Sequence, residues 1–167
     1  MPKLLLASVL FLFSTLTMAN PVDRFGKLDP EYQLPKLEGR YLSGEPFSLE
    51  KYSGKKLIIN FWATWCGPCV KEMPALIRLS KNLSSSDFEL VFVNYGETQK
   101  RVSDFWEKNY PDSTTLIDPG AKKMKSWIDK GLPTTYILNS DHEPEFKILG
   151  DLEWEHPSIS QILRTIN

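Results

Sequence analysis

The sequence has only two cysteines and two histidines among its 167 residues. A structural zinc site takes about four such ligands, and a disulfide-stapled scaffold takes several well-separated cysteines. The net charge is -1, with both signs spread along the chain, which argues against the basic face of a nucleic-acid-binding protein. These shortages indicate a globular protein whose chemistry depends on very few side chains.

The first residues differ in composition from the rest of the chain. Lys3 is followed by a mostly apolar stretch from Leu4 to Met18, and Thr17-Met18-Ala19 places small residues at the two positions that signal peptidase reads. This pattern predicts a secretory signal peptide over residues 1–19, cleaved after Ala19. The alternative is an uncleaved membrane anchor, for which the stretch is short of the roughly 20 residues that span a bilayer. We therefore expect a periplasmic or otherwise extracytoplasmic protein.

Beyond residue 19, the hydrophobic pattern alternates between buried strands and amphipathic helices. Residues 57–62 and 88–94 are nearly continuous apolar runs, typical of strands in a parallel sheet covered by helices. The pattern further predicts an extended lead-in at 20–36, a folded domain at 37–167 with a hairpin at 37–49, helices at 66–81, 98–110, 119–128 and 158–166, and strands at 114–117, 134–138 and 145–149. This order predicts an α/β fold with a central mixed β-sheet flanked by helices and an N-terminal β-hairpin extension.

The two cysteines lie in Trp65-Cys66-Gly67-Pro68-Cys69, directly after a predicted strand and at the start of a predicted helix. A helix N-terminus stabilises negative charge, so the pKa of Cys66 should lie below the free value of about 8.5. Cys69 follows one turn later on the protein side. Cys66 is therefore the expected nucleophile and Cys69 the resolving thiol of a disulfide exchange.

Other readings of the pair are weaker. Covalent haem attachment needs a histidine directly after the second cysteine, where this chain has Val70. A structural bridge over two residues would close too small a loop to stabilise the fold much. Copper handling would favour further methionine or histidine ligands, and Met73 is the one such neighbour. A non-catalytic redox-sensing module stays open, and we expect no metal and no cofactor.

Several stretches together resemble one family. Residues 60–69, Glu72-Met73-Pro74, residues 94–97 and Gly131-Leu132-Pro133-Thr134 are similar to motifs of the TlpA/ResA branch of exported thioredoxin-like proteins. The resemblance extends over about residues 30–165. It implies a thioredoxin fold and thiol–disulfide oxidoreductase activity outside the cytoplasm.

The resemblance also assigns substrate-binding residues. It implies that Pro133 is a cis proline packed against the cysteine pair, and that the backbone of Leu132 pairs with an extended substrate segment. The alternative for Pro133 is a plain proline at the start of a strand. Trp65 is expected to form an apolar lip beside Cys66. Gly67 leaves the rim open to a partner, and Pro68 lacks an N–H where a helix start needs none.

Of two acidic residues near the cysteines in the predicted fold, Glu97 is a candidate for proton transfer and Glu72 is not. Ordinary thioredoxins have a buried aspartate at the position of Asn60, so proton handling for Cys69 must come from elsewhere. Glu97 is a candidate catalytic carboxylate with a raised pKa, because it ends a strand at the carboxyl edge of the sheet and lies in a motif that is functional in ResA-type proteins. A capping or surface role is equally open. Glu72 is expected to face solvent.

The resemblance implies a reductase that acts on disulfides in exported proteins, as in cytochrome c maturation. Its partners would be disulfide-bearing protein substrates and a membrane thiol-reductant electron donor, with no nucleic acid. A general oxidant or isomerase is the alternative within the same chemistry.

Overall fold

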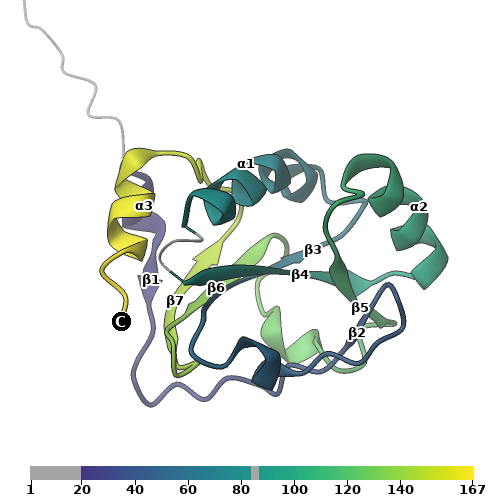
Figure 1. The fold of residues 1–167 in the computed structure, drawn as a ribbon, viewed down its shortest axis with the longest axis horizontal. Coiled ribbons are helices and arrows are strands. Elements are labelled where there is room, and N and C mark those ends of the chain that lie inside the picture. Colours follow the sequence, from purple (N-terminus) through teal and green to yellow (C-terminus); the bar gives the residue numbers. More distant parts are fainter. Residues whose placement is uncertain (1–19, 84–86) are drawn as a thin grey trace, which may run out of the picture.

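A seven-stranded sheet forms the centre of the molecule (Figure 1). The structure is a computed structural model that describes residues 20–83 and 87–167. The strand order is β1-β7-β6-β3-β4-β5-β2. The strands are β1 (Gly26–Lys27), β2 (Arg40–Tyr41), β3 (Lys56–Trp62), β4 (Phe88–Gly96), β5 (Thr115–Pro119), β6 (Thr134–Leu138) and β7 (Pro144–Leu149).

The sheet is mixed, as predicted. β3 lies at its centre and pairs in parallel with β4 and antiparallel with β6. β4 and β5 are also parallel, while β6 and β7 form the expected C-terminal hairpin. Both edge strands, β1 and β2, have only two residues and pair antiparallel with their neighbours.

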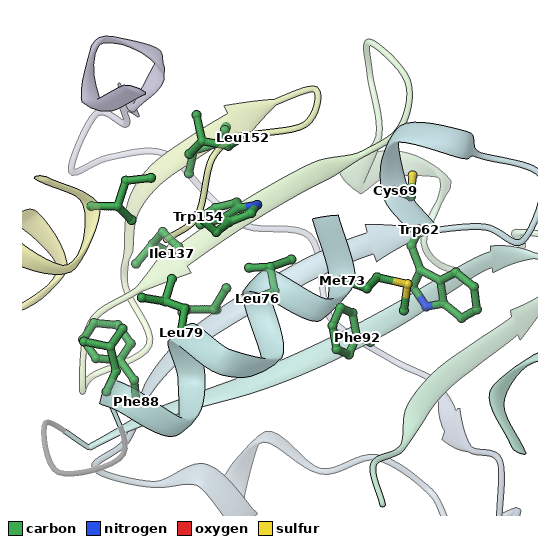
Figure 2. Close-up of a cluster of buried hydrophobic side chains, with 14 of the residues drawn as sticks. Trp62, Cys69, Met73, Leu76, Leu79, Phe88, Phe92, Ile137, Leu152 and Trp154 are labelled. Carbon is green, nitrogen blue, oxygen red and sulfur yellow. The ribbon is translucent and has the colours of Figure 1, made fainter. Parts of the chain in front are cut away.

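Three helices accompany one face of the sheet: α1 (Gly67–Leu83), α2 (Gln99–Asn109) and α3 (Pro157–Leu163). β3 residues alternate between the faces, so Ile58 and Trp62 join the core under the helices. Figure 2 shows Met73, Leu76 and Leu79 of α1 in this core, close to side chains of the strands. The cysteine pair belongs to the same cluster, so the helix-covered face is also the face of the redox site.

The opposite face is covered by an N-terminal strap, residues 28–52, which passes beneath the sheet in Figure 1. Leu57, Ile59 and Phe61 of β3 point to this side, where Trp127 and Tyr136 pack with them. The strap residues against this cluster are Leu28, Tyr32, Leu34, Leu37, Tyr41, Phe47, Leu49 and Tyr52.

The lead-in is more regular than expected. Its first residues form a short 3-10 helix, η1 (Pro21–Arg24), and β1 then pairs with β7 at the sheet edge. The N-terminal hairpin is present in a minimal form. It has one bridge, between Arg40 and Pro46, while β2 pairs with β5 rather than with a second hairpin strand.

The predicted helix at 119–128 is wrong. β5 continues through Pro119, opposite Gly96, and the chain then enters the left-handed region at Gly120 (φ 78°) and Ala121 (φ 51°). These backbone angles are incompatible with a right-handed helix. Only a 3-10 turn, η4 (Lys125–Trp127), follows, and the Asp118 carboxylate accepts from the Lys123 and Met124 N–H groups at 2.8 Å each.

Across residues 20–83 and 87–167, no helix combines the length and the apolar character needed to cross a membrane. The predicted signal peptide, residues 1–19, lies outside the described residues.

Candidate active site

Cys66 and Cys69 are joined by a disulfide at the start of α1, with their Cα atoms 5.3 Å apart. The Cys66 carbonyl accepts the first helical hydrogen bond, from the Val70 N–H at 3.1 Å. Its Sγ accepts from the Cys69 N–H at 3.3 Å. Cys66 therefore occupies the N-cap position, where unpaired N–H groups and the helix dipole favour a negative sulfur.

The two sulfur-bearing residues differ in access. Cys66 is 6% exposed and Cys69 is fully buried. A substrate disulfide can therefore reach Cys66 first, while Cys69 can react only with its neighbour. The predicted roles of nucleophile and resolving thiol require this order of access.

The rim around Cys66 is open. Trp65 is 62% exposed and, within the part of the chain that the structure describes, is the one exposed large apolar side chain. Gly67 and Pro68 are exposed as well, and a Cβ added at Gly67 would meet nothing within 4 Å. The rim thus combines an apolar contact surface with free approach to the sulfur.

The Leu132–Pro133 peptide bond is cis, as the resemblance implied. β6 begins at Thr134, opposite Phe61 near the end of β3, so Pro133 lies at the same end of the sheet as the chain leading to Cys66. The Pro133 carbonyl accepts from the Gly150 N–H at 2.9 Å, and Leu132 is half-buried.

Glu72 is buried, and the expectation that it faces solvent is wrong. It is 4% exposed and lies one turn beyond Cys69 on the inner face of α1. Its Oε2 accepts from Trp154 Nε1 at 2.8 Å and from the Leu152 N–H at 3.1 Å. Its Oε1 accepts from Asn60 Nδ2 at 2.9 Å.

The pKa of Glu72 is raised from 4.5 to about 7. Burial is the largest cause, because it disfavours the charged form, and the three hydrogen bonds oppose it only in part. The carboxyl group therefore exchanges a proton near neutral pH, close behind the buried thiol position. Chain order alone could not reveal this, because two of the three donors, Leu152 and Trp154, lie 80 and 82 residues away in sequence.

Asn60 occupies the place between Glu72 and β6. Its Nδ2 also donates to Thr135 Oγ1, at 2.9 Å. Among buried side-chain nitrogen and oxygen atoms of the described residues, only Asn60 Oδ1 has no hydrogen-bond partner. With a half-turn of the amide, Oδ1 could accept from a protonated Glu72, so the site can accommodate both protonation states.

Glu97 does not have the raised pKa that was expected. Burial would raise it, but hydrogen bonds from Asn94 and Thr64 and the charge of Arg101 outweigh that effect and lower the pKa. The carboxylate accepts from the Thr64 N–H at 2.7 Å and Thr64 Oγ1 at 2.6 Å, and Asn94 Nδ2 and Arg101 Nε lie at 2.7 Å. The structure therefore places Glu97 as an ionised anchor of the loop before Cys66.

Met73, the methionine nearest the pair in sequence, is fully buried in the core under α1. Figure 2 shows its thioether beside the indole of Trp62, so it serves packing on the inner side of the helix.

Comparison with known proteins agrees with this geometry. The Redoxin family model matches residues 29–163. The thiol-disulfide oxidoreductase ResA of Bacillus cereus is 30% identical over 128 residues, which are 77% of this chain and 71% of ResA. The thioredoxin-like protein YneN of Bacillus subtilis is 37% identical over 113 residues, which are 64% of each chain.

Solved structures show the same fold. StoA from Bacillus subtilis superposes with a TM-score of 0.62 at 28% identity, covering 77% of this chain and 96% of StoA. A secreted thiol-disulfide isomerase from Corynebacterium glutamicum gives a TM-score of 0.70 at 22% identity, covering 85% and 92%. Family model, relatives and the Cys66–Cys69 pair together confirm the resemblance drawn from the motifs. This chain belongs to the Redoxin family, in its ResA/TlpA branch of thioredoxin-fold thiol–disulfide oxidoreductases.

Proposed function

We propose that this chain reduces disulfides in exported proteins, with Cys66 as nucleophile, Cys69 as resolving thiol and Glu72 as the group that takes the proton of Cys69. The observation that carries the proposal is the burial of Glu72 and Cys69 on one face of α1, behind the accessible Cys66. With a pKa of about 7, the carboxyl group is protonated and ionised in similar proportions near neutral pH. A group that accepts a proton from a thiol needs such a pKa.

The reaction balances with two electrons. The Cys66 thiolate attacks one sulfur of the substrate disulfide, which forms a mixed disulfide and releases the other substrate sulfur as a thiolate. Cys69 then loses its proton to Glu72 and attacks Cys66 Sγ. This step releases the second substrate thiolate and leaves the Cys66–Cys69 disulfide found in the structure. The substrate is reduced and the protein oxidised.

Substrate is held by the rim and the cis-proline loop in this proposal. The exposed Trp65 offers an apolar contact, and the main chain of Leu132 can pair with an extended segment that carries the disulfide. Gly67 and Pro68 leave the approach to Cys66 open. Glu97 acts from behind, as a positioning residue for the Thr64–Cys66 segment.

The proposed setting is outside the cytoplasm, after cleavage of residues 1–19. The secreted isomerase among the structural relatives supports this setting, together with the signal-peptide pattern. In an oxidising compartment the Cys66–Cys69 disulfide must be reduced again after each reaction. A membrane thiol-reductant protein is the proposed electron donor. Apocytochrome c, whose haem-binding cysteines must be reduced, is the proposed substrate class.

Trapping the mixed disulfide tests the reaction. A Cys69→Ser protein should accumulate a covalent adduct with a disulfide-containing peptide, because attack survives and resolution does not. The matched Cys66→Ser protein should form none. Adduct formation by Cys66→Ser instead of Cys69→Ser would reverse the assigned roles.

The reduction potential tests the direction of electron flow. A value near the approximately −270 mV of thioredoxin is expected for a reductant, and a value near about −120 mV would make the protein an oxidant. The measurement is equilibration of the Cys66–Cys69 pair against glutathione or dithiothreitol buffers.

A further inference from the structure

The segment that begins at Asn20 touches the redox site through one loop. η1 packs against α3, and Ser158 Oγ donates to Asn20 Oδ1 at 2.9 Å. Directly after η1, β1 pairs with β7. The segment is thereby fixed on both sides of the 149–154 loop, which comprises the last residue of β7 and most of the connection to α3.

The side chain of Arg24 binds the main chain of this loop. Its guanidinium donates through Nη1 to the Asp151 carbonyl and through Nη2 to the Leu149 carbonyl. Gly150, between them, has φ 74°, and a Cβ at this position would lie 2.8 Å from Arg24 Nη2. The guanidinium thus fills the space that a side chain at 150 would need, and its planar fork spans both carbonyls.

Phe25 reaches the far end of the same loop. Its ring packs edge-on against Trp154, with ring centroids 6.4 Å apart, and against Phe146 at 5.3 Å. Figure 2 shows Trp154 near Leu76 of α1, with Leu152 on the far side of Trp154. Arg24 and Phe25 therefore constrain both ends of residues 149–154.

The loop donates hydrogen bonds to Pro133 and to Glu72, two residues of the proposed site. The Gly150 N–H binds the carbonyl of Pro133, at 2.9 Å. The Leu152 N–H and Trp154 Nε1 both bind Glu72 Oε2, at 3.1 and 2.8 Å. No other described residues outside the loop and Asn60 donate to the Glu72 carboxylate.

We propose that Arg24, with Phe25, is a positioning residue of the redox site, which fixes the donors that the 149–154 loop presents to Glu72 and to Pro133. The inference deepens the proposed function and rests on Glu72 as proton acceptor. It makes the N-terminal segment, which precedes the residues matched by the family model, a working part of the site.

The expected effect on Glu72 has a definite sign. Burial raises its pKa most, the donors from Trp154, Asn60 and Leu152 lower it, and the charge of Asp151 on the loop raises it to a lesser extent. Cys66 and Cys69, at the start of its own helix, are joined in a disulfide and do not titrate in the oxidised protein. Trp154 and Leu152 stay packed in the core cluster, so Glu72 stays buried when the main chain of the loop is loosened. The geometry of their hydrogen bonds depends on that main chain, so the donors weaken at nearly constant burial and the pKa of Glu72 should rise.

The test is infrared titration of the protonated carboxyl band in the oxidised protein, in which no thiol titrates. Glu72→Gln identifies the band by removing it. Arg24→Gln should move the midpoint upward by about half a pH unit or more, a threefold change in proton affinity. Lys27→Gln is the matched control, since it removes an exposed positive charge of the same segment and leaves both Arg24 hydrogen bonds intact.

Arg24→Lys separates geometry from charge and guards against a poorly folded glutamine variant. It keeps the charge but loses the fork, so an intermediate shift is expected. Equal midpoints in wild type, Arg24→Gln and Arg24→Lys would overturn the inference and leave the proposed function intact. A wild-type midpoint near the ordinary 4.5 would overturn both the proton role of Glu72 and this inference, while adduct trapping would still test Cys66 and Cys69 independently.

Discussion

At the scale of single residues, the buried carboxyl of Glu72 links stability to pH. Its pKa is about 7 in the folded protein and 4.5 as the ordinary value. Between these two values the folded protein retains a proton that the unfolded chain has released. The free energy of unfolding should therefore fall as the pH rises from 4.5 to 7, by about 3 kcal/mol in total.

Glu72→Gln should remove this dependence. Its amide is neutral at every pH and can still accept from Trp154 and Leu152. Its NH2 group can donate to Asn60 Oδ1 after a half-turn of the Asn60 amide, since Asn60 Nδ2 faces this position in the wild-type structure. We expect the variant to be more stable than wild type at pH 8, by about 2 kcal/mol, with a small difference at pH 5. Denaturant unfolding of the oxidised proteins at both values measures it, and parallel losses of stability in the two proteins would contradict it.

Asn60→Asp should do the opposite. It would place a second carboxylate beside Glu72 Oε1, now 2.9 Å from Asn60 Nδ2. Two such groups share one proton, and the second charge is expensive in a buried site. At pH 8 the variant should lose about 3 kcal/mol relative to wild type, and much of that loss should disappear at pH 5. A pH-independent loss would show that packing rather than charge is responsible.

At the scale of elements, the connection from β3 to α1 is held by Glu97. Because hydrogen bonds lower its pKa, its contribution to stability is present above about pH 4.5 and is lost as the pH falls through the lowered value. Glu97→Gln should cost about 2 kcal/mol at pH 7. The pH profile of exchange near neutrality should stay in place.

Glu107→Gln is a matched control, since it removes an exposed carboxylate from α2 and leaves the Thr64 anchor untouched. Stability and exchange rate are measured across pH 5 to 9 (about the range over which a thiol titrates). A shift of the exchange profile in Glu97→Gln, without loss of stability, would restore the proton-transfer role that the motif suggested.

Elements differ in how far sequence predicts them. The strand at 134–138 and the helix after Cys66 follow from apolar runs and a helix-start motif, which are local signals. The helix expected at 119–128 fails because Gly120 and Ala121 adopt left-handed angles, which local propensity does not fix for alanine. The sequence wrongly predicts a solvent-facing Glu72, because residues 152–154 cover the side of α1 that carries Glu72. Only tertiary packing brings these residues to the helix.

At the scale of the whole molecule, the two faces of the sheet carry different parts of the protein. The helices and the redox site share one face, and the N-terminal strap seals the other. Phe47, half-buried in the strap, stacks on Tyr52 with centroids 5.8 Å apart. Stability and redox activity should therefore be separable by mutation.

Phe47→Ala should lower the free energy of unfolding by about 2 kcal/mol, less than for a fully buried phenylalanine. The exchange rate of the folded variant should equal that of wild type, because the strap lies on the face away from Cys66. Thermal unfolding and a model-disulfide assay at a temperature well below the transition check the two quantities. A slower exchange by a fully folded variant would mean that the strap influences the site.

The sheet ends at both edges in strands of two residues, β1 and β2. A long open edge displays a row of N–H and C=O groups that can template pairing with another chain. Here each edge strand has only two residues, both paired with the neighbouring strand, and five of the seven strands lie inside the sheet. The sheet therefore offers little open template on which an extended segment of another chain could add as a further strand.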